Sequence, residues 1–380
     1  MQVRESEYLA ASGWSKPLPS ELDSPSTLIL AFGGWELRDD PKPFAELRAA
    51  FPRSVIAGCS TAGEIAGAQV RDRTVSVAIT VFKKTPLRLV HTPVENAADS
   101  AAAGARLAAM LNNDDLSAVF ILSHGVDVNG TELVHGLAKK LPAHVHISGG
   151  LAGDDAKFEN TWVLVDGQPR HGVIAAVGFY GEAIQIGVGV DGGWNDFGPD
   201  RLITKSDGHV LLELDGKPAL DLYKQYLGDF AKDLPGSGLL FPLSIRRPGD
   251  KAPPLVRTLL GVDEAAKSMT FGGDMPVGAT ARLMRTTNEK LVNAAWVAVS
   301  RATEELPVDR PALVVSVSCV GRRMLLGERT DEEVETILDG SPGGSAHIGF
   351  YSNGEIASGA EGAPAELHNQ TITITTFSER

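Results

Sequence analysis

The chain has 380 residues, and its 35 Lys and Arg against 48 Asp and Glu give a formal net charge of −13. With 43% hydrophobic and 22% charged residues, the composition is that of a globular protein long enough for two domains, which excludes a disordered or fibrous chain. The acidic excess disfavours a broad nucleic-acid or anionic-membrane surface, because phosphate groups are held mainly by Lys and Arg.

Short β-branched and aliphatic runs bounded by Gly, Pro, Asn or Asp recur in the first part of the chain, a pattern typical of strands that end in turns. A Ser- and Pro-containing lead-in occupies residues 1–26. The expected strands are residues 28–32, 54–58, 75–82, 87–91, 118–122, 162–165, 173–180 and 184–190. Apolar spacing predicts a helix over residues 41–51, and an Ala/Leu-rich stretch predicts another over 97–111.

The pattern changes after a predicted hairpin at residues 202–214 and a helix at 218–227. Residues 235–238 and 248–254 are rich in Gly and Pro, as loops are. We therefore divide the chain into the lead-in, a first domain over residues 27–220 and a second over 221–380. In the second, the expected strands are 255–260, 268–271, 281–284, 312–318, 346–351 and 371–377, with helices at 288–306 and 331–338.

The cysteine content and the apolar runs indicate a cytoplasmic protein. Cys59 and Cys319 lie far apart in the chain, which supports neither a disulfide framework nor a metal site of the CxxC type. The first residues lack the apolar stretch of a signal peptide, and no run approaches the roughly 18 apolar residues of a membrane span. We expect no membrane insertion and no secretion.

Two distant segments of the chain resemble each other. Residues 58–66 (GCSTAGEIA) align without a gap on residues 349–357 (GFYSNGEIA), with five identical positions. Each segment follows a predicted strand, helix and strand, and each precedes a further strand that ends in Phe. The sequence therefore predicts an α+β fold of two packed domains with mixed β-sheets flanked by helices, in which a β-α-β-GxxxxGEI-β unit is repeated.

The repeated segment reads as a strand that enters a tight glycine-containing turn. Glycines permit positive φ and close approach of the backbone, so such a turn can fold around a ligand or around a neighbouring turn. Two copies related by a pseudo-twofold axis favour a cleft shared by the two halves. Either copy taken alone is better explained as an ordinary turn whose glutamate caps the next element or faces solvent.

Several separated motifs resemble those of the FIST family. Residues 58–65, 149–154, 193–194 and 216–220 are similar to its N-terminal half, and residues 318–323, 349–356 and 367–371 to its C-terminal half. The resemblance spans residues 27 to 377 and implies a bacterial sensory protein of signal transduction. It implies a small ligand such as an amino acid, and a partner such as a histidine kinase, chemotaxis protein or diguanylate cyclase. Some members of the family bind haem and sense nitric oxide.

Ten residues in these motifs are candidates for binding the ligand. The Arg side chains after strand 312–318 offer planar forks for a carboxylate, and the glycine-rich segment 149–154 offers backbone N–H groups. Two glutamates in one dry cleft would repel each other and raise at least one pKa. The candidates are Cys59, Ser60, Thr61, Glu64, Gly150, Asp154, Arg322, Arg323, Tyr351 and Glu355.

Two other functions remain open from the sequence. Cys59 follows a strand at a turn, as a nucleophile would, although a buried or pocket-lining thiol is the simpler interpretation. His124 follows a strand and precedes a glycine, and we select it as the axial ligand if the protein binds haem. The spacing of the nine histidines predicts no metal site, and no catalytic residue is assigned.

Overall fold

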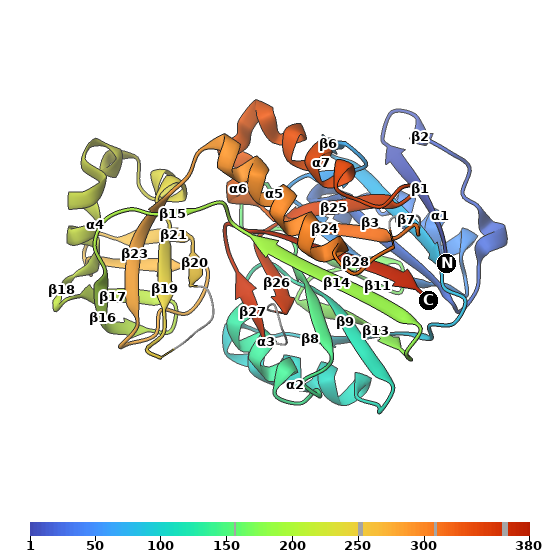
Figure 1. Ribbon diagram of the computed structural model, residues 1–380, viewed down its shortest axis with the longest axis horizontal. Helices are drawn as coiled ribbons and strands as arrows, with labels where there is room; N and C mark the ends of the chain where they lie inside the picture. Colours follow the sequence, from blue (N-terminus) through green and yellow to red (C-terminus); the bar gives the residue numbers. More distant parts are fainter. Residues whose placement is uncertain (156, 250–253, 308–309, 359–363) are drawn as a thin grey trace.

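A computed structural model describes the chain except for residues 156, 250–253, 308–309 and 359–363. The fold is α+β with several mixed sheets, as predicted. Figure 1 shows a main body that contains both termini and a smaller unit beside it. Three six- or seven-stranded sheets form the main body, and a nine-stranded sheet forms the smaller unit.

The main body consists of three units that share one order of elements: a strand, two parallel strands joined through a helical connection, a hairpin and a final strand. The first contains β1 (Gln2–Leu9), β2 (Gly13–Trp14), β3 (Thr27–Gly34), α1 (Lys42–Ala50), β4 (Val55–Thr61), β5 (Glu64–Ala66), β6 (Gln69–Arg71) and β7 (Thr74–Val81). The second contains β8 (Leu87–Pro93), α2 (Ser100–Leu111), β9 (Leu116–Ser123), α3 (Gly130–Ala138), β10 (His146–Leu151), β11 (Val163–Val165), β12 (Gln168–Arg170) and β13 (Val173–Tyr180). The third contains β14 (Ile184–Asp191), α5 (Asn288–Thr303), β24 (Leu313–Cys319), α6 (Val320–Leu326), α7 (Thr330–Asp339), β25 (Ala346–Ser352), β26 (Gly354–Ser358), β27 (Ala365–His368) and β28 (Ile372–Glu379).

The smaller unit is inserted into the third repeat, between β14 and α5. It contains β15 (Asn195–Asp196), β16 (Arg201–Asp207), β17 (Val210–Leu214), β18 (Lys217–Pro218), α4 (Ala219–Leu227), β19 (Leu243–Arg246), β20 (Leu255–Arg257), β21 (Leu259–Asp263), β22 (Ser268–Phe271) and β23 (Thr280–Arg285). The hairpin expected over residues 202–214 is formed by β16 and β17. A separate core of buried side chains holds this unit together.

Each unit gives one hairpin to the sheet of another. In every unit two parallel strands are flanked by an antiparallel third strand, as in β4-β3-β7. The hairpin β5-β6 of the first unit pairs with β25 of the third, β26-β27 of the third pairs with β10 of the second, and β11-β12 of the second pairs with β4 of the first. The exchange closes a ring. The repeat therefore has three copies in a cyclic arrangement. The pseudo-twofold relation expected from the sequence is wrong.

The copy of the repeat in the second unit is not recognisable in the sequence because its residues differ from those of the other two copies. The strand registers place Gly58, Gly149 and Gly349 at the same position, opposite Ala31, Ile121 and Ser316 respectively. Around Gly149, however, the segment 149–154 (GGLAGD) lacks the Gly-Glu-Ile of the other two copies. The helix α3 and the strand β10 of this unit were also not predicted. The strand pairing of the backbone is therefore the same in all three units, although the side chains of the second unit differ from those of the other two.

The inner faces of the three sheets share one core. Phe32 and Phe350, from the first and third units, have ring centroids 4.7 Å apart, and Phe120 of the second unit contacts Phe377 of the third. Helices cover the outer faces: α1 packs on the first sheet, α2 and α3 on the second, and α5 and α7 on the third. Burial of this shared core holds the three units together.

We predict that Gly58→Ala destabilises the protein strongly. An added Cβ would lie 1.9 Å from the carbonyl oxygen of Ala31, a backbone atom that cannot rotate away. The expected loss in free energy of unfolding is about 3 kcal/mol, the upper range for overpacking a core. Chemical denaturation measures it, with Gly343→Ala as control because nothing lies within 4 Å of that position. Equal stability of the two variants would contradict the prediction.

Candidate functional site

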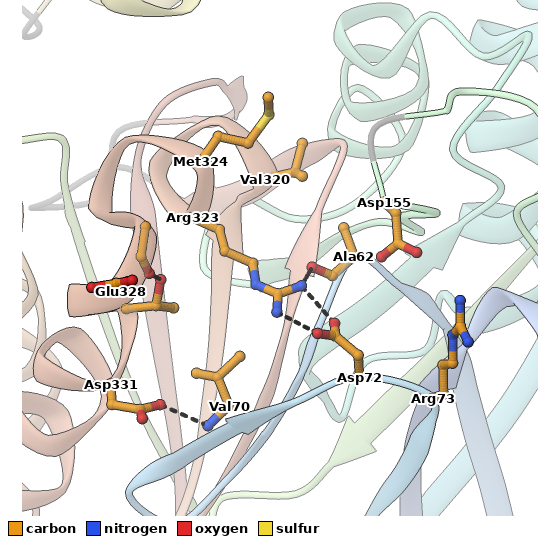
Figure 2. A pocket seen from close by; sticks show the side chains of 12 residues that line it. Ala62, Val70, Asp72, Arg73, Asp155, Val320, Arg323, Met324, Glu328 and Asp331 are labelled. Atoms are coloured by element: carbon orange, nitrogen blue, oxygen red, sulfur yellow. Dashed lines mark hydrogen bonds and ion pairs between the residues drawn. The ribbon is translucent and has the colours of Figure 1, made fainter.

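A cavity of about 780 Å³ opens between the first and third units, and Asp155 of the second unit also lines it (Figure 2). The hairpin β5-β6 and the turn after it form one wall, and α6, the following turn and the start of α7 form the other. Its lining residues are Ala62, Val70, Asp72, Arg73, Asp155, Val320, Arg323, Met324, Gly327, Glu328, Thr330 and Asp331.

Arg323 crosses the cavity from α6 to the first unit, as Figure 2 shows. Its Nη1 donates to the carbonyl oxygen of Ala62 at 2.6 Å and to Asp72 Oδ1 at 2.7 Å, and its Nη2 donates to Asp72 Oδ2 at 2.8 Å. The guanidinium also lies over the ring of Tyr351, 5.7 Å from its centroid. Burial acts to lower the pKa of Arg323, but the ion pair with Asp72 outweighs it and the pKa is raised. The side chain is a charged bridge between the units.

Other charged groups at the rim are held less tightly. Arg73 forms an ion pair with Glu36 at 3.0 Å. Asp331, in the first turn of α7, accepts a hydrogen bond from the backbone N–H of Val70 at 3.1 Å and so ties α7 to β6. Its second carboxylate oxygen has no hydrogen bond within the described part of the chain.

Arg322, the neighbour of Arg323, is buried and has a different set of partners. Its Nε and Nη2 donate to Glu333 Oε1 at 3.0 and 2.5 Å, and both terminal nitrogens donate to backbone oxygens, Nη1 to Gly192 and Nη2 to Leu291. Glu333 also accepts a hydrogen bond from the hydroxyl of Tyr351 at 2.8 Å. Through these bonds the guanidinium of Arg322 connects α6 to α7, to α5 and to the end of β14. Arg322 is therefore placed to stabilise the fold and does not line the cavity.

The two repeated glutamates are buried in matching cradles. Glu355 accepts hydrogen bonds from Ser352 Oγ at 2.7 Å and from Thr371 N and Oγ1 at 3.2 and 2.9 Å. Glu64 accepts the equivalent bonds from Thr61 Oγ1 and from Thr74 N and Oγ1. Desolvation raises the pKa of each carboxyl to about 8. Each glutamate locks the base of a hairpin that crosses to the next unit.

The first-unit candidates lie in the core. Cys59 is completely buried among apolar side chains, and burial raises the pKa of its thiol well above the ordinary value. The hydroxyl of Ser60 accepts a hydrogen bond from the backbone N–H of Trp162 at 3.0 Å. Thr61 donates to Glu64, as described above.

The second-unit candidates also have structural partners. A Cβ at Gly150 would lie 2.7 Å from Val317, so the position is closed to a larger side chain. Asp154 is buried and accepts hydrogen bonds from three successive backbone N–H groups. These bonds come from Phe158 (2.9 Å), Glu159 (2.7 Å) and Asn160 (2.8 Å). The carboxylate of Asp154 thus shapes a loop.

His124 is buried beside a second histidine. Its Nδ1 lies 2.7 Å from Thr161 Oγ1, its ring centroid is 4.1 Å from that of His171, and its Nε2 has no partner among the described residues. Burial and the neighbouring His171 lower its pKa to about 4. No group of three or more His, Cys, Asp and Glu in the described ranges is placed to hold a metal ion.

Arg323 alone among the ten ligand-binding candidates lines the cavity, and Tyr351 lies beneath it. The acidic lining residues Asp72, Glu328 and Asp331 were not predicted. The charged run Arg71-Asp72-Arg73 after the repeated segment was the available signal. Glu328 and Asp331 lie in an acidic stretch of the sequence next to a helix. Such stretches are common at the ends of exposed helices, so the sequence offers no reason to place these two residues in a site.

Comparison with known families covers most of the chain. The FIST N domain matches residues 27–217 and the FIST C domain matches residues 219–358. The protein belongs to the FIST family. Domains of the FIST family are associated with sensing in signal transduction. The division between the two matched regions falls inside the small inserted unit, so the FIST C region supplies most of that unit and the elements of the third unit from α5 to β26.

Relatives of this FIST protein occur in mycobacteria. An uncharacterized protein of Mycobacterium tuberculosis strain H37Rv is 27% identical over 353 residues, which cover 88% of this chain and 86% of the relative. An uncharacterized protein of Mycobacterium bovis is 26% identical over 259 residues, covering 66% of this chain and 61% of the relative. Among the described residues, no helix has the length and apolar character required to cross a membrane.

We predict that Glu355→Gln flattens the dependence of stability on pH. Because the folded-state pKa of about 8 exceeds the unfolded value near 4.5, the folded protein binds the proton more tightly. The contribution of Glu355 to stability is therefore fully present below about pH 4.5 and is lost as the pH rises to about 8. Denaturation at a series of pH values measures this slope, which Gln, an uncharged isostere, removes for this position. An unchanged slope between pH 5 and 8 would show that Glu355 is ionised in the folded protein.

We predict that Arg322→Met destabilises the protein far more than Arg323→Met. Removing Arg322 leaves Glu333 as an uncompensated buried charge, which costs about 3–5 kcal/mol of unfolding free energy. Arg323 pairs with a half-exposed aspartate, so its loss costs less. If the single variant fails to fold, Arg322→Met combined with Glu333→Gln tests the same point and should recover part of the stability. Equal losses for the two single variants would refute the assignment.

Proposed function

We propose that this protein is a cytoplasmic signal-transduction sensor that binds a small ligand in the cavity and signals through a protein partner. One observation carries the proposal: the cavity walls come from both matched regions of the chain. Ala62, Val70, Asp72 and Arg73 belong to the FIST N region, whereas the residues from Val320 to Asp331 belong to FIST C. A ligand there contacts both.

The arrangement supports a coupling between binding and shape. The hairpin β5-β6 starts from the first unit, ends in the third unit's sheet and lines the cavity between them. A ligand that contacts this hairpin and α6 together has a different affinity for any state in which the two separate. Such differential affinity is what a sensor requires, since a ligand with equal affinity for two states transmits nothing.

We propose an amino acid or a similar small carboxylate as the ligand, and a histidine kinase, chemotaxis protein or diguanylate cyclase as the partner. The support for the ligand is Arg323, whose fork suits a carboxylate. Asp72, which occupies that fork, is 54% exposed at its side chain, so the ion pair that a ligand carboxylate would replace is open to solvent. Family membership supports the choice of partner class.

A haem-dependent sensor is the second candidate, and one observation favours it. The Nε2 atom of His124 has no partner in the described structure, so binding haem would cost it no hydrogen bond, but the ring is buried and would first have to become exposed. Protein reconstituted with haem would show a Soret band that His124→Ala abolishes. We propose no catalysis by Cys59, because complete burial and a raised pKa keep its thiol protonated and inaccessible.

The sensor proposal predicts a ligand whose binding depends on free space in the cavity. Amino acids, carboxylates and amines are screened by thermal shift, since a compound that binds the folded state raises the melting temperature. Val70→Trp fills the cavity without a change of charge and should abolish the shift. Gln69→Trp, the neighbouring exposed position on β6, is the matched control and should retain it. A ligand that stabilises Val70→Trp as well as the wild type binds elsewhere and refutes the proposed site.

A further inference from the structure

We infer that the junction between the inserted unit and the main body is a second ligand site, which takes a small organic monocarboxylate that also carries a hydroxyl or amino group. The side chains that carry the inference are Arg257 and Thr258 of the inserted unit and Asn369 and Gln370 of the main body. None of them lines the cavity of Figure 2. The inference therefore goes beyond the proposed function and is tested separately from it.

Polar contacts hold the inserted unit against the main body. The chain passes between the two bodies twice, from β14 to β15 and from β23 to α5, and β20 lies on the side of the inserted unit that faces β27 (Figure 1). In the described part of the chain, no hydrophobic core cluster includes side chains of both bodies. The contacts include an ion pair between Arg247 and Glu366 and a hydrogen bond from Gln370 Nε2 to the carbonyl oxygen of Leu239. Because the interface is polar, the two bodies can separate to admit a ligand without exposing an apolar core.

Arg257 places a buried positive charge at this junction. It is the last residue of β20 and is 1% exposed. Its Nη1 donates to the carbonyl oxygen of Leu367 in β27 at 3.0 Å and to that of Val256 at 3.3 Å. Burial lowers its pKa to about 10, so the guanidinium is still charged at neutral pH. A buried charge is costly unless an opposite charge accompanies it.

The two carboxyl groups nearest in charge to Arg257 are bonded to other residues. Glu366 pairs with Arg247 at 2.9 Å, and Asp274 Oδ1 accepts a hydrogen bond from Asn129 Nδ2 at 3.1 Å. The Nε of Arg257 reaches only the carbonyl oxygen of Asp274, at 3.4 Å. Among the described residues, no ion pair within 4.0 Å involves Arg257. Its fork is therefore free to pair with a carboxylate that enters the junction.

Three uncharged side chains at the junction have polar atoms without a partner. Asn369, Gln370 and Thr258 are 2%, 0% and 5% exposed. In the part of the chain that the structure describes, Oδ1 of Asn369, Oε1 of Gln370 and Oγ1 of Thr258 take part in no hydrogen bond. Buried side-chain oxygens in native proteins nearly always have a partner. These atoms can therefore accept hydrogen bonds from a hydroxyl or amino group of a ligand.

Two consecutive glycines bring the charged group and an uncharged group together. A Cβ on Gly272 would lie 3.0 Å from Asn369 Oδ1, and a Cβ on Gly273 would lie 2.7 Å from Arg257 Nε. Because consecutive Cα atoms are about 3.8 Å apart, the amide and the guanidinium are within reach of one small molecule. The absence of side chains at both glycines leaves room for this approach.

The chemistry of these groups selects the ligand. One guanidinium matches one carboxylate, and the acceptor atoms match a hydroxyl or amino group close to that carboxylate. A second carboxylate on the ligand would find no second unpaired cation among the described side chains and would lie in the field of Glu366 and Asp274. The ligand would contact the inserted unit and the main body together, and so would hold them in one arrangement.

Calorimetric titration of the protein with L-lactate, L-serine, propionate and succinate tests the inference. We expect L-lactate or L-serine to bind, and propionate, which lacks the donor, and succinate, which adds a charge, to bind about tenfold more weakly or not at all. Val70→Trp fills the other cavity and should leave the affinity within twofold of the wild type.

Variants of the junction identify the site. Arg257→Gln removes the buried charge and should weaken binding about a hundredfold, because it removes a two-bond ion pair. Arg246→Gln removes an exposed charge from the neighbouring strand β19 and should leave the affinity within twofold. Asn369→Asp keeps the size of the side chain, places a fixed carboxylate in the site and should abolish binding. It decides the question if Arg257→Gln does not fold.

The outcomes separate this inference from the proposed function. Loss of binding in Val70→Trp with full binding in Arg257→Gln or Asn369→Asp would overturn the inference and leave the site at Arg323 in place. An affinity for propionate equal to that for L-lactate and L-serine would overturn it as well, since the uncharged side chains would then take no part. Absence of binding by all four compounds, or equal weakening by Arg246→Gln and Arg257→Gln, would also overturn it.

Discussion

Three backbone hydrogen bonds at the ends of the central strands are the constraint on which the rest of the structure depends. They run from Ala62 N to Tyr351 O (2.8 Å), from Gly153 N to Ser60 O (2.9 Å) and from Asn353 N to Leu151 O (3.2 Å). Each bond joins one unit to the next, in the same cyclic order as the exchanged hairpins. Since each unit receives a hairpin from one neighbour and supplies its own hairpin to the other, no unit completes its sheet alone.

The cavity is a consequence of this ring, because the three junctions are filled differently. At the junction of the second and first units, Trp162 is completely buried and packs against Phe44. At the junction of the third and second units, Leu367 packs against the start of α3 at Gly130. At the junction of the first and third units, an arginine and charged rim residues replace such apolar side chains. The cavity with its charged lining remains there.

Two adjacent arginines show that the type of a residue does not by itself indicate whether it stabilises the core or lines a cavity. Both Arg322 and Arg323 follow β24, and both carry a fork that suits a carboxylate. On a helix, however, neighbours in sequence point about 100° apart, so one faces the interior and the other the first unit. Arg322 meets a buried glutamate and becomes part of the core, whereas Arg323 meets a half-exposed aspartate and lines the cavity.

Much of the fold could be predicted from local patterns. The α+β class, the repeated Gly-Glu-Ile turn and most of the strands follow from β-branched runs that end at glycines, because turn geometry and strand propensity act over a few residues. The family resemblance follows from the same motifs. The copy of the repeat in the second unit, around Gly149, could not be predicted, since its pairing depends on backbone atoms that every residue possesses.

The candidate site depended on tertiary structure almost throughout. From the sequence, Cys59, Glu64 and Glu355 are polar groups at turns, the usual position of ligand-binding side chains. In the structure, exchange of the hairpins buries Glu64 and Glu355, because the strand after each turn continues into a neighbouring sheet, and Cys59 lies in the core that the three sheets share. The sequence alone determined where the chain turns. Only the packing of the three units against one another decided which residues of each turn are buried, because the strands that cover them lie far away in the chain.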